Sequence, residues 1–166
     1  KILEQEMVDF INQNPDKAPI TIQIGSNAAR MATVVNAYGR TGRSSIVFGA
    51  AIRFLKKVLD QVGLRNKFGI KAHAKHEYGV DVLNFSPKAK GANELIKGDP
   101  AKYGLFVTGT HNEPMSIVNR LLENKDQKNL GFINPRTHVF IFSQTQIADN
   151  REWFKVIKWM ERRGFS

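Results

Sequence analysis

Along this chain, short apolar stretches rich in β-branched residues alternate with segments whose apolar residues recur every three or four positions. The stretches expected to form strands are 20–24, 45–48, 105–109 and 138–143, with a further extended segment at 80–85. The segments with helical spacing are 1–14, 28–38, 50–62, 93–97, 115–123 and 152–163. Such alternation is typical of a parallel sheet covered by helices on both faces. The sequence therefore predicts an α/β fold, a three-layer α/β/α sandwich with a mostly parallel, Rossmann-like sheet.

Several local details sharpen this prediction. The residues expected to face the core from the helix at 28–38 are Met31, Val34, Val35 and Tyr38. Ser26 or Asn27 would cap that helix. Pro114 is expected at the first position of the helix that continues to Glu123, and 124–134 is expected to be a polar loop. The apolar residues of the last helix are Phe154, Ile157, Trp159 and Met160.

Length and composition indicate one globular domain over residues 1–166. The chain is 42% hydrophobic and 24% charged, a balance that allows a buried core. It has no cysteine, which excludes disulfides and Cys-ligated zinc. There is no run of about 18 apolar residues and no apolar leader, so we expect no membrane association and a cytoplasmic location. The first residue is Lys1 rather than Met, and we expect the chain to be a piece of a longer protein.

The net charge of +10 is unevenly distributed. The segment 40–75 contains one acid, Asp60, and nine basic residues: Arg40, Arg43, Arg53, Lys56, Lys57, Arg65, Lys67, Lys71 and Lys75. A second cluster closes the chain, with Lys155, Lys158, Arg162 and Arg163 beside Glu161. Such clusters either keep a surface solvated or contact nucleic-acid phosphates. A membrane surface is disfavoured, because no basic amphipathic tail stands apart from the globular pattern.

In parallel α/β sheets, ligands bind at the loops that follow the carboxyl ends of the strands. Three stretches at these loops form an ordered set: Ile24-Gly25-Ser26-Asn27-Ala28-Ala29-Arg30-Met31, Thr41-Gly42-Arg43 before a short strand and Gly49, and Val107-Thr108-Gly109-Thr110-His111-Asn112-Glu113-Pro114-Met115-Ser116. A fourth, weaker stretch is Ile147-Ala148-Asp149-Asn150-Arg151. Together they resemble the motifs of the β-CASP domain of metallo-β-lactamase-fold nucleases, most closely those of the ribonuclease J family.

The chain departs from that family at identifiable positions. His111 and Asn112 stand where the family has Gln-Gly, and Ala148, Asp149 and Arg151 replace its Pro, Gly and Glu. The middle of the chain, 65–102, is longer and more basic than in the family. These departures bear on which subfamily the chain resembles and on its detailed contacts with substrate, and not on the fold.

The resemblance implies the RNA-binding part of an enzyme that processes and degrades RNA as an exonuclease and endonuclease. In that family, two zinc ions bound by the metallo-β-lactamase domain activate the water that attacks the phosphodiester. Their His-x-His-x-Asp-His motif does not occur in this sequence. We therefore expect no catalytic residue, metal or cofactor in this segment. The expected partners are single-stranded RNA and the metallo-β-lactamase domain of the same parent chain, in a parent that the resemblance also allows to be a homo-oligomer.

The residues nominated for RNA contact follow the strands: Ser26, Asn27, Arg30, Gly109, Thr110, His111, Asn112, Glu113, Asn150 and Arg151. Ser26 and Asn27 would hold a phosphate or only cap a helix. Arg30 is either a phosphate clamp or a solvated residue. His111 stacks on a base, donates to a phosphate, or is only a tolerated replacement of the family's Gln. Glu113 either shapes a turn or faces substrate.

The remaining histidines and aromatic residues have structural interpretations. His73 and His76 are spaced like metal ligands, but no third ligand is evident, and His138 opens a strand and is expected to be structural. The aromatic residues expected in the core rather than as base platforms are Phe54, Trp153, Phe154 and Trp159. Two other functions stay open: a stand-alone nucleic-acid-binding module, and the β-CASP part of a DNA nuclease or a messenger-RNA 3′-end endonuclease.

Overall fold

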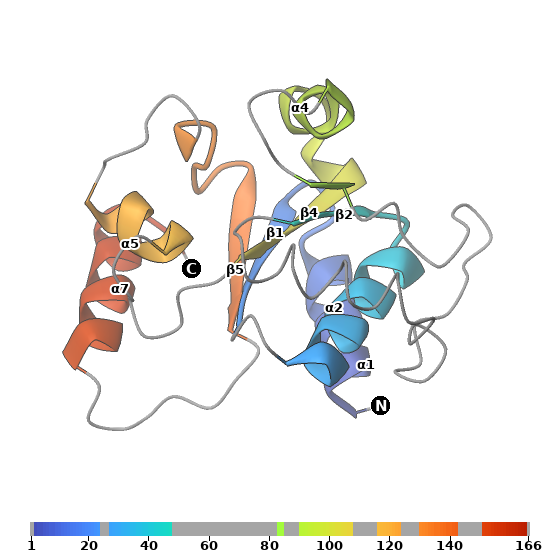
Figure 1. Cartoon of the computed structure of the whole chain (residues 1–166), viewed down its shortest axis with the longest axis horizontal. Coiled ribbons are helices and arrows are strands. Elements are labelled where there is room, and N and C mark those ends of the chain that lie inside the picture. Colours follow the sequence, from blue (N-terminus) through green and yellow to red (C-terminus); the bar gives the residue numbers. More distant parts are fainter. Residues whose placement is uncertain are drawn as a thin grey trace.

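A five-stranded parallel sheet forms the centre of the molecule (Figure 1). The computed structural model describes residues 2–23, 27–47, 83–84, 90–107, 116–123, 130–142 and 151–165. The strands are β1 (Ala18–Ile22), β2 (Ser44–Val47), β3 (Leu83–Asn84), β4 (Tyr103–Val107) and β5 (His138–Phe142). Their order in the sheet is β3-β2-β4-β1-β5, and every neighbouring pair is parallel. The predicted α/β class with a parallel sheet is confirmed.

Helices cover both faces of the sheet (Figure 1). They are α1 (Ile2–Gln13), α2 (Ala28–Arg40), α4 (Lys90–Lys97), α5 (Ile117–Leu122) and α7 (Arg151–Arg162), with a short 3-10 turn, η2, at Pro100–Lys102. α1 and α2 pack on one face, and α5 and α7 lie on the other. Within the described ranges, no helix combines the length and the apolar character needed to cross a bilayer.

The core consists of two apolar clusters, one on each face of the sheet. Neighbouring residues of β4 point to opposite faces, so Leu105 packs with α5 and α7 while Phe106 packs with α1 and α2. The predicted inward residues of α2 are all buried: Met31, Val34, Val35 and Tyr38. β1, β2 and β4 are buried along their whole length, as expected for strands inside a parallel sheet. β1 and β4 are mainly apolar, whereas β2 begins with two buried serines, Ser44 and Ser45.

The start of β1 differs from the prediction, since the strand begins at Ala18 and includes Pro19. Ala18 donates its N–H to the carbonyl of Thr137, on the side of β5, at 2.8 Å. N–H groups alternate in direction along a strand, so the nitrogen of Pro19 faces β4. The pairing of β1 with β4 begins only at Ile20, opposite Leu105. Proline therefore occupies a position where no ladder donor is needed.

Two predictions in the second half of the chain are corrected, one on where a helix starts and one on a loop whose residues 124–129 lie outside the described residues. α5 begins at Ile117 rather than at Pro114, because Ser116 is its N-cap and accepts the N–H of Asn119 at 3.1 Å. The segment expected as a polar loop also contributes to the core. Leu130 and Ile133 are buried in the apolar cluster on the α5 and α7 side of the sheet, because burying apolar side chains is favourable even where polar residues surround them in the sequence.

Candidate nucleic-acid interface

The carboxyl ends of the strands meet at one edge of the sheet, where α2 and α7 begin (Figure 1). Three nominated residues are described at this edge: Asn27 before α2, Arg30 in its first turn, and Arg151 at the start of α7. The structure thus places them at the edge where parallel α/β sheets bind their ligands. The other nominated residues lie outside the described residues: Ser26, Gly109, Thr110, His111, Asn112, Glu113 and Asn150.

Asn27 is the N-cap of α2. Its backbone is extended, with φ −87° and ψ 91°, and its side chain accepts the backbone N–H of Arg30 at 2.9 Å. That bond satisfies one of the unpaired N–H groups at the start of the helix. The side-chain oxygen of Asn27 is thus engaged in capping. Its side-chain NH2 group, on an exposed residue, is the part with the polarity to donate to a phosphate.

Gln23 contacts the N-cap residue of α2, and sequence analysis did not nominate it. The residue is buried directly after β1, where its N–H donates to the carbonyl of Val107 at 3.1 Å. Its side-chain NH2 donates to the carbonyl of Asn27 at 3.4 Å. The spacing of two places Gln23 on the same face of β1 as Thr21, and the structure shows that both are buried. A buried amide therefore ties the end of β1 to the start of α2.

At this edge, the N-termini of α2 and α7 each carry a cation. The N-terminus of a helix has a partial positive charge and favours acidic side chains in its first turn. The first turn of α2 contains no acid and contains Arg30, whose guanidinium pairs with no carboxylate among the described residues. Arg151 is the first residue of α7 and is exposed. These positions are unfavourable for the isolated helices and raise the positive potential that an anion would meet.

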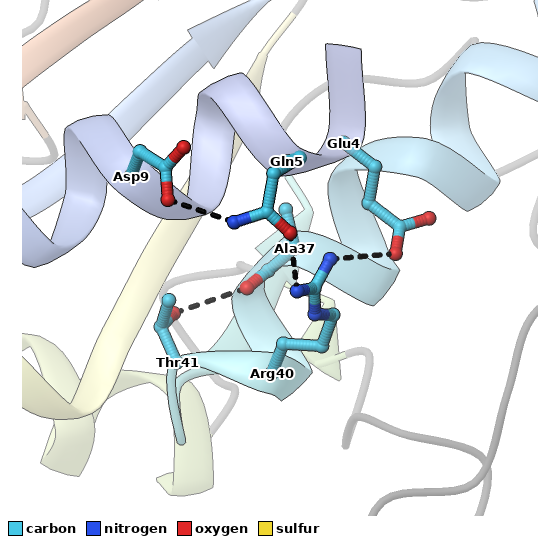
Figure 2. Close-up of polar contacts among 6 residues, drawn as sticks. All are labelled: Glu4, Gln5, Asp9, Ala37, Arg40 and Thr41. Atoms are coloured by element: carbon cyan, nitrogen blue, oxygen red, sulfur yellow. Dashed lines mark hydrogen bonds and ion pairs between the residues drawn. The ribbon is translucent and has the colours of Figure 1, made fainter. Parts of the chain in front are cut away.

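The two described basic residues of the segment 40–75, Arg40 and Arg43, both have partners within the protein. Arg40 at the end of α2 forms an ion pair with Glu4 of α1 at 3.2 Å and donates to the side-chain oxygen of Gln5 at 2.7 Å (Figure 2). Gln5 donates in turn to Asp9 at 2.7 Å (Figure 2). Arg40 therefore joins the two helices on this face.

Arg43 is a structural residue. Only 4% of it is exposed, and its guanidinium donates to the carbonyls of Pro15 at 2.8 Å and Lys17 at 3.4 Å. Burial lowers the pKa of Arg43 from its usual value. The Arg of the Thr-Gly-Arg stretch thus holds the connection between α1 and β1, and Gly42 before it adopts φ 74° in the turn. The seven other basic residues of this segment lie outside the described residues.

The second basic cluster lies on α7 and just after it. Lys155, Lys158, Arg162 and Arg163 are all exposed, as is Arg151. Among the aromatic residues, Trp153 is buried as predicted, but Phe154 is not in the core, since 54% of it is exposed. The helix turns Trp153, Val156 and Met160 inward, which leaves Phe154 on the solvent side. Phe54 lies outside the described residues.

His138 has the structural role expected of it. The ring is 2% exposed, and Nδ1 accepts the N–H of Asn134 at 3.4 Å and contacts the hydroxyl of Thr137 at 2.8 Å. Nε2 lies 3.1 Å from the hydroxyl of Tyr103, so both ring nitrogens have protein partners. Burial lowers the pKa of His138 to about 4.

Within the described part of the chain, no group of three His, Cys, Asp or Glu side chains is placed to hold a metal ion. His73 and His76 lie outside it. Comparison of the sequence with models of known protein families found no match. Comparison with curated proteins found no match either.

Proposed function

We propose that this chain is the RNA-binding β-CASP part of a ribonuclease J-like, metal-dependent nuclease of the cytoplasm. The observation that carries the proposal is the pair of cations, Arg30 and Arg151, at two helix N-termini on the carboxyl edge of a parallel sheet. Helix dipoles and guanidinium groups at one edge favour a polyanion there. The four sequence stretches that resemble the β-CASP motifs support the same assignment.

In this proposal the chain supplies binding and orientation rather than bond cleavage. Arg30 and the NH2 group of Asn27 hold backbone phosphates, while the buried Gln23 holds Asn27 through its main-chain carbonyl. The hydrolytic step belongs to two zinc ions in the metallo-β-lactamase domain of the parent chain. That domain is also the partner against which the carboxyl edge closes the RNA channel.

The proposal predicts salt-dependent binding of single-stranded RNA to the 166-residue chain. Fluorescence anisotropy with a labelled 12-nucleotide oligouridylate measures the affinity between 50 and 500 mM salt. Arg30→Gln should weaken binding about threefold to fivefold near physiological salt, as expected for one lost phosphate contact. Arg40→Gln is the matched control, because it removes the same charge from the other end of α2 and should have little effect.

The alternatives predict different results. Equal losses for Arg30→Gln and Arg40→Gln would mean diffuse charge attraction and would contradict a site at the carboxyl edge. Tighter binding of the deoxyribose strand of the same sequence would favour a DNA nuclease. Hydrolysis of RNA by this chain in the presence of zinc or manganese, abolished by a chelator, would contradict the assignment of the chemistry to another domain.

A further inference from the structure

One side of α7 carries a continuous row of cations. Its four exposed members are Arg151, Lys155, Lys158 and Arg162. The spacings of four, three and four residues place them within an arc of roughly 60° on the helix, over a length of roughly 16 Å. The opposite side of α7 holds Trp153, Val156 and Met160, which are buried in the core. The row therefore points away from the sheet.

Phe154 borders this row. It lies three residues after Arg151 and four before Lys158, the spacings at which helical side chains are neighbours. Among the described residues, the only exposed large hydrophobic side chains are Phe154 and Ile2, which is at the start of α1. The other aromatic residue near the surface of α7 is already engaged, because Trp159 stacks on Phe165 and lies under the Arg163 guanidinium at 5.0 Å. Phe154 is thus the aromatic side chain of α7 that is exposed to solvent beside the cations.

We infer that the outer face of α7 binds single-stranded RNA, with the row of cations following the phosphates and Phe154 stacking on a base. Proteins that bind single strands combine a cationic track with an aromatic platform in this way. The inference rests on the proposed function and extends it. Arg151 belongs both to the carboxyl edge and to the row, so a strand that meets Arg30 and Arg151 would continue along α7 toward Arg162.

Charge and shape favour RNA over the other anionic surface, a membrane. A helix that lies on a membrane inserts a broad apolar face into the lipid. The apolar face of α7 is buried against the sheet. Its outer face carries the four cations, one exposed large apolar side chain, Phe154, and one bordering exposed acid, Glu161. Like charges three and four residues apart also repel along the helix. A polyanion that tracks the row would relieve that repulsion.

The test compares two double variants of the 166-residue chain that lose the same charge. Lys158→Gln with Arg162→Gln removes half of the row. Lys97→Gln with Lys102→Gln removes two exposed cations from α4 and η2, at the amino edge of the sheet. Neither variant touches Arg30 or Arg151. Anisotropy with the labelled oligouridylate should show a loss of about tenfold near physiological salt for the α7 variant only, with a smaller salt dependence of its affinity.

The role of Phe154 in base stacking is tested separately. Phe154→Ala should weaken binding of oligouridylate about fivefold or more, as expected for one lost stacking contact. It should leave unchanged the affinity for an abasic ribose-phosphate strand of the same length. Phe154→Trp should keep the affinity for both strands.

Each outcome has one meaning. If the wild type does not bind RNA, the proposed function and this inference fail together. If the wild type binds and Arg30→Gln weakens it, but the α7 variant equals its control, only the inference fails. Binding to phosphatidylserine vesicles that is lost in the α7 variant, with RNA affinity unchanged, would assign the row to a membrane and overturn the inference.

Discussion

The ring of Tyr38 lies directly against Gly104, so that a Cβ atom at position 104 would overlap the ring and stand 2.7 Å from Cδ2. Tyr38 comes from α2 and Gly104 from β4, and both are enclosed by the sheet and the two helices on this face. The absence of a side chain at 104 lets the ring reach the sheet. Its hydroxyl then meets Thr21 at 2.7 Å and the carbonyl of Leu105 at 2.9 Å.

Gly104→Ala should destabilise the protein by about 1–3 kcal/mol, because the added methyl group forces the buried ring or the strand to move. Urea unfolding monitored by circular dichroism measures the loss. Tyr38→Leu makes room for the methyl group, so Gly104→Ala should cost less in that background. Additive losses in the two single variants and the double variant would contradict direct contact.

Tyr38→Phe should cost about 1–2 kcal/mol, because it leaves the Thr21 hydroxyl and a strand carbonyl without their buried partner. The pKa of Tyr38 is raised by burial, so the hydroxyl is a neutral donor at every ordinary pH. Thr21→Val in combination with Tyr38→Phe should cost less than the sum of the single changes, as measured by the urea midpoint. Independent effects would show that the pair does not act as a unit.

Arg43→Met should lower the free energy of unfolding by about 2 kcal/mol, since charged donors to buried carbonyls are worth more than neutral ones. Arg40→Met provides the comparison on a neighbouring residue. Its ion pair with Glu4 is solvent-exposed, so its loss should cost less than about 1 kcal/mol. A larger loss for Arg40→Met, by the same urea measurement, would contradict the structural role assigned to Arg43.

Stability should fall as the pH drops from about 6.5 to about 4 because of His138. The folded protein keeps the ring neutral down to a pKa of about 4, whereas an unfolded histidine takes up a proton near 6.5. The unfolded state therefore binds more protons in this window, and the linkage amounts to at most about 3 kcal/mol. His138→Asn should show a shallower decline of the urea midpoint between pH 7 and pH 4.5. An unchanged slope would show that groups other than His138 cause the decline in stability.

Asn27→Asp separates capping from phosphate binding. Aspartate caps a helix as well as asparagine does, so the thermal midpoint should stay the same or rise slightly. Its negative charge would repel a phosphate held by the NH2 group, so the affinity for oligouridylate should fall. Asn27→Ala should cost about 1 kcal/mol of stability. An unchanged affinity in Asn27→Asp would leave Asn27 as a cap only.

The order of the elements was predictable from the sequence, because the apolar period of strands and helices is local. The helix at 28–38 and its four inward residues were confirmed in α2, and the strand at 138–143 in β5. Element starts were less predictable. Pro19 enters β1 because β4 does not pair there, and Ser116 rather than the residue before Pro114 caps α5. Both outcomes depend on hydrogen-bond partners that a pattern of residue types does not specify.

For the candidate site, the sequence alone determined the residue types at the ends of the strands and the excess of positive charge. Only the tertiary structure decided which cations face solvent. Arg43 is buried and donates to main-chain carbonyls, and Arg40 forms an ion pair with Glu4. Arg151 and Arg162 lie in the exposed row of cations on α7. The physical reason is that a charge count ignores desolvation and pairing. Whether a guanidinium meets a carbonyl, a carboxylate or water is set by segments far apart in the chain.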